Sequence, residues 1–147
     1  MYKYKNYLET AQEIIQGCVD IADEVGKQKI GRPAGVTTEG NVYDTDYIES
    51  PYSENSKTDF IDNIKSIQNA YLGSNDGDAS VSDYVKTVSP ETNEEVVAAI
   101  NNAIAKIEAI PGVFRKNYNT QEAKDAAEAC GTTLVNALNK AIRALEE

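Results

Sequence analysis

Apolar residues recur every three or four positions in four long stretches of this chain, and that spacing constrains the fold more than any other feature. It places the apolar side chains along one side of an α-helix, whereas a half-buried strand alternates at every second residue. Strand-like alternation is absent, and glycine and proline separate the stretches as they do at helix ends. The pattern therefore predicts an all-α protein.

Four amphipathic helices can bury their apolar stripes only against one another, which predicts an up-down four-helix bundle. We expect one domain over residues 1–147, a long loop between helices one and two, and a short extra helix before helix three. The expected helices cover about 3–28, 56–72 and 80–88, then run from Ser89-Pro90-Glu91 to Pro111-Gly112, and from the capping pair Asn119 and Glu122 to the end. The expected stripes are Leu8, Ala11, Ile15, Cys18, Ala22 and Val25; Phe60, Ile64, Ile67 and Tyr71; Val97, Ile100, Ile104 and Ile107; and Ala123, Ala127, Cys130, Leu134, Ala137, Ala141 and Leu145.

Composition narrows the function by exclusion. The chain has 24 acidic and 14 basic side chains, a formal charge of -10, so nucleic acid and anionic membranes are poor partners. Its longest apolar run, Val96 to Ile100, is far shorter than a membrane span. There is no histidine, which removes the usual general base and the commonest transition-metal ligand. We therefore assign no catalytic residue and no certain metal ligand from the sequence.

The connection from Gly31 to about Asn55 is longer than bundle links usually are. It carries several aromatic and aliphatic residues, so we expect it to pack on another surface: Val42, Tyr43, Tyr47, Ile48 and Tyr52. It is also acidic, and Asp44, Asp46 and Glu49 could hold a hard cation such as calcium or iron. The competing interpretation is a solvated acidic loop, because the spacing matches no EF-hand.

Two cysteines, Cys18 and Cys130, fall on the stripes of helices one and four. They could form one disulfide or remain as buried thiols that act as small hydrophobes. The first residues lack the apolar core of a secretory signal, which fits a cytoplasmic chain or a mature or truncated piece.

One part of the sequence resembles a known family. Glu49-Ser-Pro-Tyr-Ser-Glu-Asn-Ser56, Asp59-Phe60, Asp62-Asn63-Ile64, Ile67, Asn69-Ala-Tyr-Leu-Gly73 and Ser82-Asp83-Tyr84-Val85 resemble the carboxy-terminal half of imelysin-like proteins, also called insulin-cleaving membrane proteases or iron-regulated proteins. The resemblance implies an all-helical bacterial protein, exported to the periplasm or held at the outer membrane as a lipoprotein, linked to iron uptake and classed as a metallopeptidase. The family's metal motif, Gly-x-His-x-x-Glu, lies in the amino-terminal half and has no counterpart here.

The resemblance therefore implies a helical binding or structural half that is not catalytic alone. Its partner would be the missing amino-terminal half or another protein, and exposed apolar surface would also allow a homodimer. The positions expected to face the cleft or the missing half are Glu49, Tyr52, Ser53, Asn55 and Asp59. A purely structural interpretation competes, in which Ser53 and Ser56 cap helix two and Asn55 holds the loop. Two other functions stay open: an autonomous cation-binding domain, and part of a metallopeptidase completed by a partner half.

Overall fold

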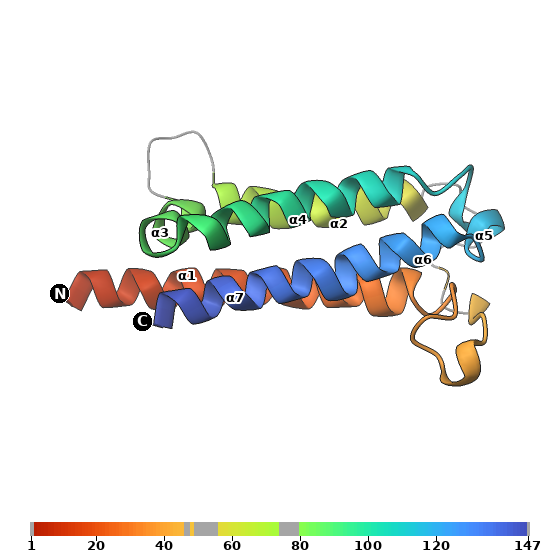
Figure 1. Cartoon of the computed structure of the whole chain (residues 1–147), viewed down its shortest axis with the longest axis horizontal. Helices are drawn as coiled ribbons and strands as arrows, with labels where there is room; N and C mark the ends of the chain where they lie inside the picture. The colour runs from red at the N-terminus through yellow and green to blue at the C-terminus, as the bar shows by residue number, and fades with distance from the viewer. Residues whose placement is uncertain (1, 46–47, 49–55, 74–79, 147) are drawn as a thin grey trace.

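The computed structural model describes residues 2–45, 48, 56–73 and 80–146, with side chains from Tyr7 onward. Four long helical rods form it (Figure 1). The first rod joins α1 (Tyr2–Asp23) to the π-helical segment η1 (Glu24–Ile30), and the second is α2 (Ser56–Leu72). The third is α4 (Pro90–Glu108), and the fourth joins α6 (Gln121–Glu128), the π-helical segment η4 (Ala129–Leu134) and α7 (Val135–Glu146). Shorter elements are η2 (Glu39–Asn41), α3 (Val81–Val88) and α5 (Phe114–Asn117).

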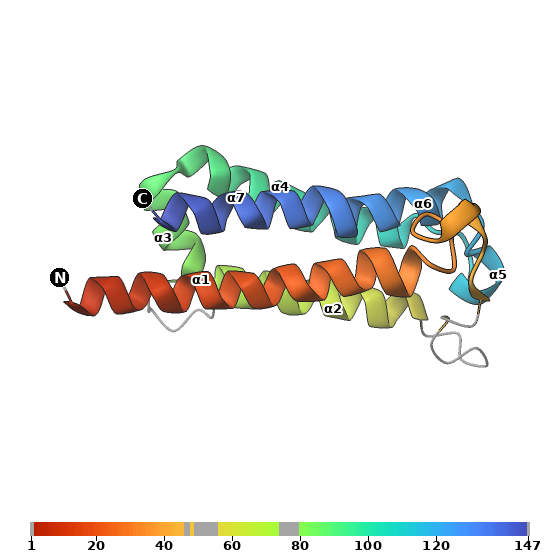
Figure 2. The same cartoon turned by 90° about the horizontal axis from the view of Figure 1, so that it is seen from below.

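The rods pack in a ring, α1 against α2 and α7, and α4 against the same two helices. Successive rods run in opposite directions, so both termini lie at one end, while the loop after η1 and α5 lie at the other (Figures 1 and 2). The described residues contain no strand, and the all-α bundle is confirmed. None of their helices is both long and apolar enough to cross a membrane.

The predicted stripes form most of the core. In the second and fourth rods every predicted stripe residue is buried, and in the first rod all but the half-buried Leu8 are. Helix α4 differs: Val97 and Ile104 are only half-buried, and its core face is made by Val96, Ala99, Ile100, Ala103 and Ile107. The alanines matter because they let the neighbouring rods approach that face closely.

Local capping sets where the helices begin. Ser80 and Asp83 form the predicted capping box, in which each side chain accepts from the other residue's backbone N–H, at 3.1 and 2.9 Å. Ser89 caps α4 ahead of Pro90, as predicted. The predicted cap Asn119 is wrong, because the Thr120 hydroxyl accepts from the Ala123 N–H at 3.2 Å and the helix starts one residue later.

A partly buried polar cluster joins three helices near the end of the bundle that carries the termini. The Asn93 side-chain oxygen on α4 accepts from the Tyr71 hydroxyl on α2 at 2.8 Å and from the Ser82 hydroxyl on α3 at 2.7 Å. Tyr71 is fully buried and Ser82 nearly so, so each hydroxyl needs a partner inside the protein. Burial raises the Tyr71 pKa well above its ordinary value. The shared acceptor fixes α3 across α2 and α4.

Both cysteines are buried free thiols. Burial raises the pKa of Cys18 to about 11 and that of Cys130 to about 12. The sequence left a disulfide and two buried thiols as alternatives, and the structure has two free thiols. Both side chains fill core space as small hydrophobes.

Candidate functional site: a cleft where two π-helical segments cross

The first and fourth rods are in tight contact where both leave α-helical geometry. Segments η1 and η4 lie against each other, and Gly26 faces Gly131 at the crossing. A Cβ on Gly26 would lie 2.1 Å from the Gly131 nitrogen, so no side chain fits there. π-helical turns are rare and frequently occur at functional sites, which directs attention to this crossing.

The segment after η1 folds back over this end of the bundle. The Thr37 hydroxyl donates to the Lys27 carbonyl at 2.5 Å, which satisfies a backbone group of η1. Arg32 pairs with Asp44 through Nη2 at 2.7 Å and Nε at 3.1 Å, and the Asp44 N–H donates to the Arg32 carbonyl at 2.9 Å. The ring of Tyr43 meets that of Tyr118 edge-on at 5.8 Å. Of the loop residues expected to pack, Tyr43 thus contacts Tyr118 and Ile48 is buried, but Val42 is exposed. Tyr47 and Tyr52 lie outside the described residues.

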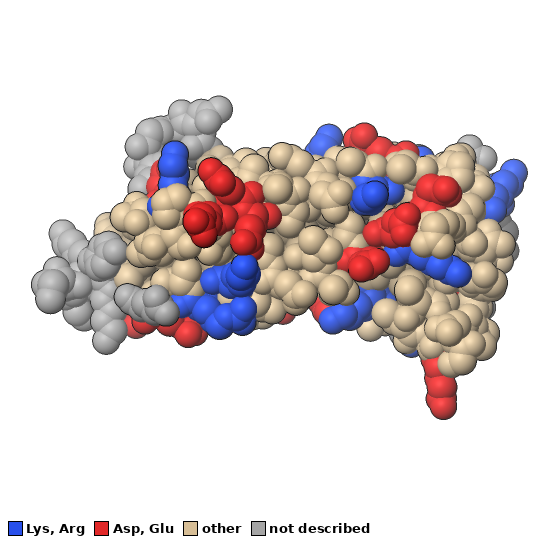
Figure 3. Space-filling view, viewed as in Figure 1, with Lys and Arg blue, Asp and Glu red and all other residues tan. Residues whose placement is uncertain are grey.

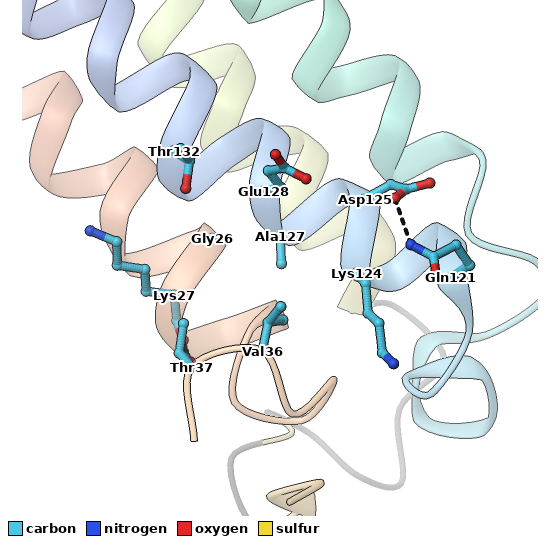
Figure 4. Close-up of a pocket in the computed structure, with 10 residues that line it drawn as sticks. All are labelled: Gly26, Lys27, Val36, Thr37, Gln121, Lys124, Asp125, Ala127, Glu128 and Thr132. Carbon is cyan, nitrogen blue, oxygen red and sulfur yellow. Dashed lines mark hydrogen bonds between the residues drawn. The ribbon is translucent and has the colours of Figure 1, made fainter. Parts of the chain in front are cut away.

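A cleft of about 380 Å³ opens beside the crossing, a size that suits a small ligand or a few side chains of a partner. Val36 and Ala127 point toward one another across it (Figure 4). Polar residues surround this apolar centre. The lining comprises Gly26, Lys27, Val36, Thr37, Gln121, Lys124, Asp125, Ala127, Glu128 and Thr132.

The charged groups at the rim do not form a catalytic arrangement. Lys27 is engaged by Asp23 one turn earlier at 2.7 Å, and its ammonium points away from the cleft (Figure 4). Gln121 donates to Asp125 at 2.9 Å. Within the described ranges, no three His, Cys, Asp or Glu residues are placed to hold a metal ion together. The cleft has an apolar floor and a rim with both positively and negatively charged side chains. This combination is suited to binding and orienting a partner group.

A second, shallower groove of about 530 Å³ lies between α4 and the fourth rod. Thr132 lines both hollows, so groove and cleft adjoin. The groove is lined mainly by small and uncharged residues, and a band without charges crosses this face between two clusters of charged groups (Figure 3). Its lining comprises Glu95, Ala98, Ala99, Asn102, Thr132, Thr133, Asn136, Ala137 and Lys140.

Most of the sequence-predicted site lies outside the described residues. Glu49, Tyr52, Ser53 and Asn55 lie outside the described residues, and Asp59 is exposed in the first turn of α2. Of the proposed cation ligands, Asp46 and Glu49 also lie outside them. The Asp44 carboxylate is paired with Arg32, which opposes its use as a metal ligand.

Sequence reasoning missed the residues that build the crossing. Gly26 and Gly131 both lie inside helical patterns, where glycine lowers the stability of the helix. Their presence at these unfavourable positions was the one sequence signal that could have indicated the crossing. Val36 and Thr37 belong to the long connection that the sequence singled out, but they carry neither its acidic nor its aromatic character.

Comparison with known proteins agrees with this architecture. The profile of the imelysin family matches residues 2–145, almost the whole chain. The chain belongs to the imelysin family. The resemblance to the imelysin family found in the sequence is therefore confirmed. No curated protein matches the chain at a significant level.

Two solved structures are similar to it. An imelysin peptidase from Bacteroides ovatus is 36% identical, with a TM-score of 0.76 over 90% of this chain and 38% of its own. A protein described as an iron-regulated protein A precursor, from Parabacteroides distasonis ATCC 8503, is 32% identical, with a TM-score of 0.72 over 86% of this chain and 38% of its own. This imelysin-family chain thus spans well under half the length of these solved relatives.

Proposed function

We propose that this chain is the helical binding and structural part of an imelysin-type exported bacterial protein linked to iron uptake, and that it is not catalytic alone. The observation that carries the proposal is coverage: the chain matches 38% of each solved relative, so most of a relative's length has no counterpart here. The names of the relatives supply the peptidase and iron associations. The missing part would bring the histidine that this chain lacks.

In this proposal the cleft at the η1–η4 crossing is one wall of the shared site. Its apolar floor and its rim of mixed charge can bind and orient a group, but supply no nucleophile and base in contact. The alternative of an autonomous cation-binding domain is weakened by the Arg32–Asp44 pair. A metallopeptidase completed by a partner half remains the second outcome of the same test.

The test compares this chain alone with the chain mixed with the portion of the Bacteroides ovatus imelysin that it does not match. Hydrolysis of fluorescein-labelled casein is the readout for activity, and calorimetric titration with Fe²⁺ and Ca²⁺ is the readout for cations. We expect the chain alone to hydrolyse nothing and to bind neither ion stoichiometrically. Hydrolysis or a stoichiometric cation site in the chain alone would refute the proposal.

A matched pair of variants locates the site. Val36→Trp should fill the cleft, because Val36 points across it, whereas Val42→Trp in the same segment lies outside the lining. Both positions are exposed, at 44% and 63%, so neither substitution should prevent folding. Activity or cation binding that arises only in the mixture should fall with Val36→Trp and persist with Val42→Trp. Equal behaviour of the two variants would remove the cleft from the proposed site.

A further inference from the structure

Helix α1 carries a second apolar row besides the one that enters the core. Tyr7, Ile14 and Ile21 follow one another at intervals of seven, close to two helical turns, so they share one side of the helix. Their exposed fractions are 55%, 38% and 36%. The Tyr7 ring stacks on Tyr84 at 6.4 Å, but the isoleucines remain partly open to solvent. A row of apolar side chains along an exposed side marks a surface for another chain.

Gly17 lies beside this row, within α1, and nothing in the described structure accounts for it. A Cβ at that position would meet no atom within 4 Å, in contrast to Gly26 and Gly131, which are held by the rod crossing. Glycine in a helix interior is unfavourable unless a close backbone approach requires it. No backbone within the described residues approaches Gly17 in this way. This indicates that the approaching backbone belongs to another polypeptide segment.

The row leads into a groove at its far end. Ile21 lines a hollow of about 280 Å³ together with Asp20, Glu24, Val25 and Lys29 of the first rod and Asn63 of α2. The groove therefore lies between α1 and α2, which pack along each other on this side of the bundle (Figure 2). An amphipathic helix laid along α1 would place its apolar side on the isoleucines and continue into the groove.

The charges beside the row define the partner. Glu9, Glu13, Asp20 and Glu24 are all exposed and recur at intervals of four, seven and four, so they form one acidic edge of α1. Two copies that met antiparallel on this face would bring the same acidic edges together, and each copy already carries a formal charge of -10. A second copy is therefore disfavoured, and a helix with a basic edge is favoured.

We infer that the Tyr7–Ile14–Gly17–Ile21 side of α1 is the seat of a helix from the remaining part of an imelysin-type protein, a helix with an apolar side and a basic edge. The inference rests on the proposed function, which requires such a remaining part, and on the 38% coverage of the solved relatives. Gly17 is the point of closest approach, and the acidic edge orients the incoming helix.

The test is binding of the unmatched portion of the Bacteroides ovatus imelysin, made as a separate polypeptide and shown by circular dichroism to be helical. Gly17→Leu fills the point of approach, and the Cβ that it adds meets no atom within 4 Å. The matched control is Ala105→Leu, an enlargement at another exposed position, on α4. We expect calorimetry to show binding that Gly17→Leu weakens at least tenfold and Ala105→Leu leaves unchanged. Ile14→Ser should weaken the same binding, and added salt should weaken it further because the edge is charged.

Three outcomes would overturn the inference: no binding by the helical probe, binding that Gly17→Leu leaves intact, or self-association of this chain in sedimentation that Gly17→Leu abolishes. These results are separable from failure of the proposed function. The proposed function fails if the chain alone shows hydrolysis or a cation site. The substitutions on α1 do not affect either of those measurements.

Discussion

Replacing Gly26 by alanine isolates the energetic role of the η1–η4 crossing. The added Cβ would lie 2.1 Å from the Gly131 nitrogen and 2.4 Å from its Cα, where ordinary contacts need more than 3 Å. Both neighbours are backbone atoms, so the two rods must separate. Overpacking of this kind costs about 3 kcal/mol, while alanine regains up to about 1 kcal/mol of helix propensity. The free energy of unfolding should therefore fall by about 2 kcal/mol.

Thermal and urea unfolding followed by circular dichroism measure this change. A loss of about 2 kcal/mol corresponds to a Tm lower by about 4–8 °C in a chain of this size. Gly17→Ala in the same rod is the matched control, and it should raise stability by about 1 kcal/mol because its Cβ meets nothing. Gly131→Ala should fall between them, since its nearest contact is the flexible Lys27 side chain at 3.1 Å. A Gly26→Ala protein as stable as the parent would refute the close crossing.

Three further predictions concern the ends and the core of the bundle. Asn93→Ala should lower the free energy of unfolding in urea by about 2–3 kcal/mol, because two buried hydroxyls lose their common acceptor; a loss below 0.5 kcal/mol would contradict that network. Ser80→Ala should cost about 1 kcal/mol through the lost cap, measured the same way, with an unchanged midpoint as the contrary result. Cys18 and Cys130 should resist Ellman's reagent at neutral pH and react as two thiols in guanidinium. Burial raises their folded pKa values above the ordinary value of 9.0, so stability should be full well below pH 9 and fall above it as the unfolded thiols ionise, by about 1.4 kcal/mol per thiol at pH 10. A Cys18→Ala/Cys130→Ala protein should lack that part of the loss.

The regular part of the fold was predictable because its causes are local in sequence. The bounds of α2 follow from the stripe Phe60 to Tyr71 and from Gly73, and the start of α3 follows from a serine and an aspartate three residues apart. Capping and periodicity act over one or two turns, so one sequence contains the information. The predicted cap Asn119 was wrong by one residue, because the neighbouring Thr120 caps α6.

The cleft could not be predicted because its causes are distant in sequence. Gly26 and Gly131 acquire meaning only when the first and fourth rods are placed side by side. Helical periodicity also treats a π-helical turn as a continuation of the helix, so both rods were expected to be regular. Several of the acidic and aromatic residues that distinguish the long connection, Glu49 and Tyr52 among them, lie outside the described part. Its described part acts through Thr37 and Arg32, which bind neighbouring groups of this chain.

The two ends of the bundle are built by different means, and the difference bears on where function resides. At the end with the termini, polar groups are satisfied within a compact cluster centred on Asn93, which stabilises the packing of α2, α3 and α4. At the other end, two rods both leave α-helical geometry and have glycine at their contact, with a cleft beside it. Alanine in two regular helices would have joined these rods with less loss of helix stability. Local rules are broken chiefly where a structure serves something besides its own stability, and this supports the proposal that a shared site lies at the η1–η4 end rather than at the Asn93 cluster.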